Sequence, residues 1–201
     1  MRRRLAITHC LSVKNRKTVI TILIGEVLNV RGILEIMEVY TMIKEVMEKD
    51  IAECVNLIRS SFFTVAEQFG FTEENAPRFT AFATTHDRLE WQLLAEHRPM
   101  YAYWDGDVIV GCYSLQLSDH NTCELSNLCV SPEYRHKGIG EELVKHAFHV
   151  AKELNYSNMN IGIVEENTIL RKWYEELGFD HVGTKKFDFF PFTYGYMKKE
   201  L

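Results

Sequence analysis

A short run of basic residues and glycines, residues 135–140, has the composition of a phosphate-binding loop. The run consists of Arg135, His136, Lys137, Gly138, Ile139 and Gly140. The basic side chains bring positive charge, and the glycines allow the backbone to approach a ligand closely because they carry no Cβ. A helix that began at the end of the run would add N–H groups and a dipole that favour an anion. We therefore interpret residues 135–140 as a pyrophosphate cradle.

The segments on both sides of the cradle predict the strand and the helix that would position it. Residues 125–130 are mostly apolar and predict a buried strand. Residues 141–154 carry apolar side chains at the spacing of one helix face. These are Leu143, Ala147, Val150, Ala151 and Leu154. The cradle is therefore expected at the turn of a strand–turn–helix unit.

Two other phosphate-binding motifs do not fit this run. A Walker A loop requires G-x-x-x-x-G-K-[ST], which does not occur in the sequence. A dinucleotide fingerprint requires a third glycine and an early position in a βαβ unit, and residues 138–143 lack that glycine. The pattern that remains is R-x-x-G-x-G, directly after a strand and the pair Ser131-Pro132.

This pattern closely resembles the acyl-CoA loop of the GNAT superfamily of N-acetyltransferases. A second segment, residues 167–179, is similar to the GNAT helix that flanks the pantetheine arm and ends in Tyr-x-x-Leu-Gly-Phe. Gly178 stands where a C-capping glycine would end that helix. The resemblance covers residues 42–201. It implies a mixed α/β (α+β) fold, with a central, mostly antiparallel twisted sheet flanked by helices.

The resemblance also implies acetyl-CoA as co-substrate, with an amine attacking the thioester carbonyl. The cradle would hold the CoA. In GNAT proteins the strand before the cradle splays from its neighbour, so the backbone of Leu128, Cys129 and Val130 would bond the pantetheine amides and the thioester oxygen. Asn167 matches the asparagine that typically bonds the pantetheine arm. The resemblance implies no metal.

Two side chains are expected to move protons in this reaction. Glu124 lies upstream on the cradle strand, at a spacing similar to the catalytic glutamate of some GNAT members, and could act directly or through a water. The alternative interpretation is a charge at the strand edge. Asp119 and His120, in the preceding turn, are further candidates for the base. Tyr174 matches the family tyrosine near the CoA sulfur and would protonate the thiolate, unless it is a core tyrosine.

The remaining chain predicts further elements of the same domain. The expected strands are residues 42–46, 100–104, 108–117, 122–130, 159–164, 181–187 and 192–198, and the other expected helices are residues 50–62, 85–97 and 167–177. Asp50 is expected to N-cap its helix, with Glu53 completing an approximate capping box. His146 and His149 lie one turn apart, which we interpret as a solvated helix face rather than a metal site.

Aromatic residues gather in two parts of the chain that could face an acceptor. The first group, Phe63, Phe69, Phe71, Phe79 and Phe82, could line an acceptor pocket, although core packing is the preferred interpretation for most of them. The second group is Tyr113, Phe190, Phe192, Tyr194 and Tyr196. This second group suggests a largely apolar acceptor pocket.

Length and composition limit the remaining interpretations. The 201 residues suit one domain, residues 42–201, preceded by an extension, residues 1–41, that is either a docking element or the product of an early start codon. The net charge of -5 argues against broad nucleic-acid binding. The five cysteines form no C-x-x-C pair, which favours a reduced, cytoplasmic protein. No stretch has the length of a membrane span.

The predicted function is acetyl transfer from acetyl-CoA to a primary amine of a small molecule or peptide, by direct attack in a ternary complex. The first alternative is a catalytically inactive acyl-CoA-binding or interaction module of the same fold. The second is an unrelated phosphate-ligand protein, which the second motif disfavours. The resemblance leaves a homodimer open, and it does not identify the acceptor.

Overall fold

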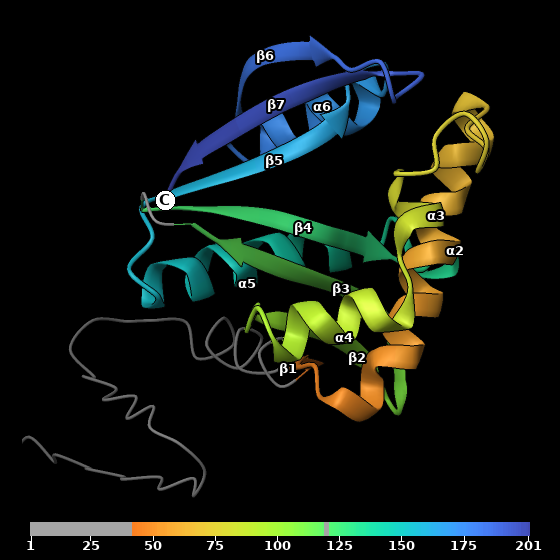
Figure 1. Cartoon of the computed structure of the whole chain (residues 1–201). Coiled ribbons are helices and arrows are strands. Elements are labelled where there is room, and N and C mark those ends of the chain that lie inside the picture. Colours follow the sequence, from red (N-terminus) through yellow and green to blue (C-terminus); the bar gives the residue numbers. More distant parts are fainter. Residues whose placement is uncertain (1–41, 119–120) are drawn as a thin grey trace, which may run out of the picture.

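The computed structural model describes residues 42–118 and 121–201 (Figure 1). The predicted extension, residues 1–41, and the candidate bases Asp119 and His120 lie outside the described residues. The strands are β1 (Ile43–Glu45), β2 (Met100–Asp105), β3 (Val108–Leu117), β4 (Thr122–Val130), β5 (Asn158–Val164), β6 (Asp180–Lys186) and β7 (Thr193–Glu200). The helices are α2 (Ile51–Phe69), α3 (Thr80–Ala83), α4 (His86–Leu94), α5 (Ile139–Glu153) and α6 (Thr168–Glu176).

The described strands form one sheet of seven strands in the order β1-β2-β3-β4-β5-β7-β6. Neighbouring strands are antiparallel except β4 and β5, which are parallel. The parallel pair is connected through α5, as parallel neighbours require a crossover. The predicted mixed α/β fold with a mostly antiparallel sheet is therefore confirmed.

Helices cover both faces of the sheet. On one face, Leu143 of α5 and Tyr174 of α6 share a core cluster with Leu115 of β3 and Met159 of β5. On the other face, α2 and α4 pack over β2 to β4. Figure 1 shows α5 and α6 on the far side of the sheet from α2, α3 and α4. The two faces therefore have separate apolar cores, and side chains that alternate along β4 enter one or the other.

The strands β4 and β5 separate after a short paired stretch. Only Thr122, Cys123 and Glu124 pair with β5, opposite Asn158, Met159 and Asn160, although both strands continue. Figure 1 shows β4 and β5 diverging from this paired end toward α2 and α3. The splayed strand that the family resemblance implies is therefore present, with Glu124 as the last paired residue of β4.

The start of α2 differs from the sequence prediction. Asp50 does not cap α2 with its side chain; instead Asp50 Oδ2 accepts from the Met47 N–H at 2.9 Å. Glu53 Oε1 accepts from the Ile109 N–H on β3 at 2.9 Å, so the predicted capping box is wrong. A short 3₁₀ turn, Glu48–Asp50, runs directly into α2, and Asp50 already has helical dihedral angles. The helix also runs on to Phe69 and ends at Gly70, which has a φ of 69°.

Two expectations about aromatic and histidine side chains are also wrong. His146 is buried, and its Nδ1 lies 2.7 Å from the hydroxyl of Tyr113, so His146 does not belong to a solvated helix face. Tyr113 is only 1% exposed and packs in the core on the α5 face, away from the presumed acceptor side. The β3 register places Tyr113 beneath α5, and the sequence gives no signal of that contact. Phe71 and Phe79 of the first aromatic group lie in a third core cluster, as the preferred interpretation of that group expects. Phe192, which the second group assigned to the acceptor side, is buried in the same cluster and packs against both rings.

Candidate active site

The predicted cradle lies between the end of β4 and the start of α5. Gly138 precedes α5 with a φ of 87°, a value that favours glycine, and His136 also has a positive φ of 62°. Within the described residues, the backbone N–H groups of residues 136–140 donate no hydrogen bond, and the first bond of the helix runs from Glu142 to the Gly138 carbonyl at 3.1 Å. These N–H groups and the N-terminus of α5 are therefore available to an anion.

The side chains of the cradle are arranged in two ways. His136 and Lys137 are exposed, and the Lys137 ammonium lies 4.4 Å from the centre of the Tyr134 ring. Arg135 turns inward instead. Its Nε donates to the Val130 carbonyl at 3.3 Å, and its Nη2 donates to the Ser61 carbonyl of α2 at 2.9 Å. The Arg135 guanidinium therefore ties α2 to the end of β4, while its backbone belongs to the cradle.

The second predicted motif lies beside the cradle. A Cβ added at Gly140 would lie 3.5 Å from the Trp173 ring of α6, which is ordinary contact distance. Asn167 caps α6, because its Oδ1 accepts from the Leu170 N–H at 3.1 Å. The two motifs that are separated in the sequence are therefore packed together through α5 and α6.

A bulge interrupts β4 next to the backbone that is predicted to bind the thioester. Ser126 pairs with Ser114, and Cys129 pairs with Cys112, so β4 contains one residue more than β3 between these pairs. Asn127 adopts a positive φ of 56° there. Because a bulge bends its strand, it contributes to the separation of β4 from β5.

The three residues after Asn127 differ in which of their groups are available to a ligand. The Cys129 side chain is buried, with its Sγ 3.5 Å from the Sγ of Cys112, so only its backbone is available to a ligand. The Val130 carbonyl accepts from Ser61 Oγ at 3.3 Å as well as from Arg135. Leu128 is partly exposed. The structure thus places all three at the open end of β4.

Glu124 lies at the narrow end of the gap between β4 and β5. Its neighbours Cys123 and Leu125 point into the core on the α5 face, so Glu124 points to the opposite face. Solvent reaches the side chain, yet the surrounding protein desolvates the carboxyl and raises its pKa. The positive charge of Arg98 opposes this rise. A carboxyl with a raised pKa in an accessible gap has the properties of a general base.

Tyr194 stands next to Glu124 on the same face. Burial, and then the negative charge of Glu124, raise the pKa of Tyr194 to about 12. A Cβ added at Gly162 of β5 would overlap the Tyr194 ring, so this ring lies directly across β5. The Tyr196 ring packs against it at a tilt, with ring centres 4.8 Å apart. Tyr194 and Tyr196 are thus placed on the side that the sequence predicted for the acceptor, whereas Tyr113 is not.

Tyr174 is 7% exposed on the α6 face and packs against Trp173 and Phe179. Burial alone raises the pKa of Tyr174 well above its usual range, with no contribution from a hydrogen bond or charge. The hydroxyl therefore stays protonated at neutral pH and could donate a proton. The structure does not bring Tyr174 and Glu124 together, because they lie on opposite faces of the sheet.

Sequence reasoning missed several residues around this site. Arg98 is 26 positions from Glu124 in the chain and comes near it through the β2–β3 and β3–β4 registers together, which no local pattern encodes. Asn127 carries the bulge, although a positive φ is uncommon for a residue other than glycine. Within residues 42–118 and 121–201, no three His, Cys, Asp or Glu side chains gather as a metal site would require. No helix in the described part of the chain is long and apolar enough to cross a bilayer.

Comparisons with known proteins agree with this architecture. Residues 56–179, more than half of the chain, match the model of the Acetyltransferase (GNAT) family. The uncharacterized N-acetyltransferase YvbK of Bacillus subtilis is 31% identical over 84 residues, which cover 42% of this chain and 54% of YvbK. Thialysine N-epsilon-acetyltransferase of Bos taurus is 28% identical over 149 residues, which cover 69% of this chain and 84% of that protein.

A solved structure shares the fold across most of the described chain. PaiA N-acetyltransferase from Thermoplasma acidophilum, in complex with coenzyme A, superposes with a TM-score of 0.69 at 18% identity. The superposition covers 79% of this chain and 98% of that chain. At this identity the likeness concerns the fold alone.

Proposed function

Because the chain belongs to the acetyltransferase (GNAT) family, we propose that it transfers an acetyl group from acetyl-CoA directly to a primary amine in a ternary complex. The observation that carries the proposal is the separation of β4 from β5 beyond Glu124. It leaves an edge of β4 backbone beside a loop of unused N–H groups. An extended thioester with a pyrophosphate at one end suits both features.

The cradle residues suit the pyrophosphate of CoA. The free N–H groups of residues 136–140 and the start of α5 would bind the phosphate oxygens, with positive charge from Lys137. The backbone of residues 128–130 would bond the pantetheine amides and the thioester oxygen. The Asn167 Nδ2 group would add a donor, because only the Oδ1 atom is used in capping α6. Bound acetyl-CoA would supply the activated acetyl group.

Proton transfer would involve one group on each face of the sheet. Glu124 would accept a proton from the incoming ammonium, directly or through a water, so that the amine nitrogen can attack the carbonyl carbon. The new C–N bond forms as the C–S bond breaks. The Tyr174 hydroxyl would donate a proton to the departing thiolate. The acceptor could be a small molecule or a peptide.

Equilibrium unfolding with and without acetyl-CoA tests the binding part of this proposal. At about a hundred times its dissociation constant, acetyl-CoA should stabilise the wild type by about 2.7 kcal/mol. Gly138→Glu should abolish this shift, because it places a side chain and a negative charge in the cradle. Gly106→Glu is the matched control: Gly106 also has a positive φ, 61°, but lies in the β2–β3 turn, and its variant should keep the shift.

Two results would count against the proposal. If acetyl-CoA does not stabilise the wild type, residues 135–140 are not a pyrophosphate cradle for CoA. A wild type that binds acetyl-CoA but acetylates no amine would be an inactive acyl-CoA-binding module. The presence of Glu124 and Tyr174 on their respective faces favours turnover over this alternative.

A further inference from the structure

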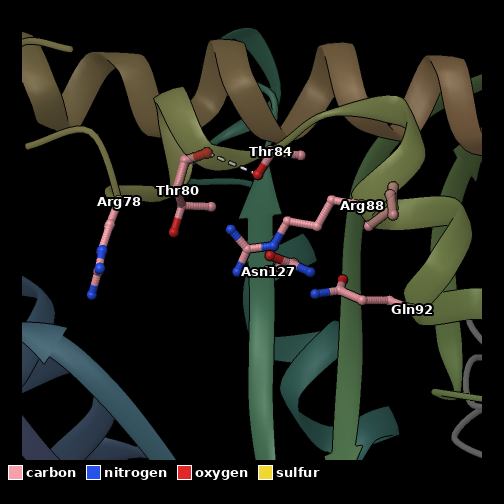
Figure 2. Close-up of a pocket in the computed structure, with 7 residues that line it drawn as sticks. Arg78, Thr80, Thr84, Arg88, Gln92 and Asn127 are labelled. Atoms are coloured by element: carbon pink, nitrogen blue, oxygen red, sulfur yellow. Dashed lines mark hydrogen bonds between the residues drawn. The ribbon is translucent and has the colours of Figure 1, made fainter. Parts of the chain in front are cut away.

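A small polar pocket lies between α3, α4 and the bulge of β4 (Figure 2). Its polar lining consists of Arg78, Thr80, Thr84, Arg88, Gln92 and Asn127. Figure 2 shows the Arg88 guanidinium extending from α4 across β4 to a position beside Asn127, with Gln92 nearby. The pocket therefore opens on the face of the sheet that carries Glu124.

The charge of this pocket is one-sided. Two arginines and no Asp or Glu line it. Neither Arg78 nor Arg88 forms an ion pair with a described residue. Arg88 Nη1 donates to the Ala83 carbonyl at 3.2 Å, and the Arg78 guanidinium lies 4.6 Å from the centre of the Phe189 ring. Both guanidinium groups are thus positioned by the protein while their charges are not neutralised within the described chain.

Gln92 supplies a further polar group to the pocket. The residue is only 7% exposed, and its side-chain amide makes no hydrogen bond to a described residue. Because Gln92 lines the pocket, its amide can donate to or accept from a ligand group there.

The size and position of the pocket fit one end of a small substrate. Its volume is about 40 Å³, which is room for about three water molecules and therefore for a carboxylate. Asn127, at the pocket wall, directly precedes Leu128 and the backbone assigned to the thioester. A planar carboxylate also matches the fork of an arginine, which can bind it through two hydrogen bonds.

We propose that this pocket, the Arg78–Arg88 pocket, binds the carboxylate of the acceptor, so that the protein acetylates amines that carry a carboxylate. The inference rests on the proposed function and assigns the substrate class of the same site. The amine would reach the thioester beside Glu124, while the carboxylate is held by the arginines at the β4 bulge. The short path along β4 between these points favours a small amino acid over a long peptide.

Binding of reaction products tests the inference without turnover. The probes are the N-acetyl derivatives of glycine, β-alanine and 4-aminobutyrate, which place nitrogen and carboxylate progressively further apart, each paired with its neutral amide. Affinities are measured calorimetrically with the full chain saturated with CoA. For at least one chain length, the wild type should bind the acid about ten- to hundred-fold more tightly than the amide, as expected for a charged hydrogen-bonded pair.

Variants assign the preference to the pocket. Arg88→Gln and Arg78→Gln should each reduce the preference for the acid. If either arginine variant fails to fold, Gln92→Leu takes its place, and this variant should weaken binding of the acid. Arg59→Gln is the matched control. Arg59 Nη1 donates to the Thr84 carbonyl at 3.2 Å, but Arg59 does not line the pocket, so its loss removes a similar bond and charge. The preference for the acid should persist in Arg59→Gln.

Several outcomes would overturn the inference. A wild type that binds CoA but shows no preference for any acid would exclude the carboxylate site and leave the acetyltransferase proposal intact. A preference that survives in both pocket arginine variants, or that is lost equally in Arg59→Gln, would also exclude the Arg78–Arg88 pocket. Failure of acetyl-CoA to stabilise the wild type would instead overturn the proposed function and the acceptor assignment with it.

Discussion

Glu124 and Tyr174 lie on opposite faces of the sheet. Glu124 points from β4 to the solvent-accessible face that carries Tyr194, whereas Tyr174 is buried in the core between α6 and the sheet. Burial raises the pKa of the Glu124 carboxyl, which makes its carboxylate a stronger base, and burial keeps the Tyr174 hydroxyl protonated.

Replacement of Glu124 by glutamine should slow the chemical step. The variant keeps the shape of the side chain but cannot accept a proton, so kcat should fall about 100- to 10,000-fold while acetyl-CoA affinity stays unchanged. Steady-state kinetics and calorimetry measure the two quantities. Glu67→Gln, an exposed carboxylate on α2, is the control and should retain full kcat. Full activity in Glu124→Gln would show that another group is the base.

Replacement of Arg98 by glutamine should move the acidic limb of the pH–rate profile. The Arg98 charge lowers the pKa of Glu124 against the effect of burial, so its removal raises that pKa. Because the base must be deprotonated, activity should then be lost at a higher pH as the pH falls. The kcat/KM profile reports this limb. Glu96→Gln removes the ion-pair partner of Arg98 but keeps the Arg98 charge, and it should produce no upward shift. If the acidic limb does not move in Arg98→Gln, the group that titrates in this limb is not Glu124.

Replacement of Tyr174 by phenylalanine should reduce kcat by about 100-fold or more without reducing stability. The hydroxyl is desolvated and no charge or hydrogen bond contributes to its pKa, so its removal leaves no buried partner unsatisfied. Kinetics and denaturant unfolding on the same sample measure both effects. Tyr156→Phe, at the partly exposed turn before β5, is the control. If Tyr174→Phe lost stability and activity together, the residue would be a core tyrosine.

The buried His146 should make the free energy of unfolding depend on pH. Burial, and then the charge of His149, lower its pKa from 6.5 to about 4. The unfolded chain therefore binds the proton more strongly, and stability should be complete above about pH 6.5 and decline by up to about 1.4 kcal/mol per pH unit as the pH falls toward 4. Urea unfolding across this range measures the slope.

The slope can be assigned to His146 with two variants. His146→Gln should flatten it, although the variant loses the bond to Tyr113 and is less stable throughout. His149→Gln, which replaces the exposed neighbour, should keep most of the slope. An unchanged slope in His146→Gln would mean that other groups cause the acid sensitivity.

The sequence predicted the cradle and the second motif because each is encoded locally. The apolar strand, the glycines and the helix spacing all lie within residues 125–154, and the strand–turn–helix unit was confirmed. Local patterns could not give the inward turn of Arg135, since its partner Ser61 lies 74 positions away. The same holds for the contact of Glu53 with Ile109, which depends on how α2 packs on the sheet.

The residues proposed to bind the acceptor were less predictable than those proposed to bind CoA. Aromatic composition assigned Tyr194 and Tyr196 to the presumed acceptor region, and the structure places Tyr194 close enough to Glu124 to feel its charge. The same composition also included Tyr113, which the β3 register directs into the core. Composition gave no sign of the Arg78–Arg88 pocket, because its residues come from three separate segments. The roles of residues 1–41, the cytoplasmic location and homodimerisation stay predictions.

The most direct test of acetyl transfer is to measure CoA release and amine acetylation together. The full chain is incubated with isotopically labelled acetyl-CoA and a panel of amino acids, polyamines, aminoglycosides and short peptides, and the products are identified by mass spectrometry. We predict CoA release that depends on the acceptor, one labelled N-acetyl product for each CoA released, and no label retained on the protein. Tight binding of acetyl-CoA without acceptor-dependent release, or label held on the protein, would contradict direct transfer in a ternary complex.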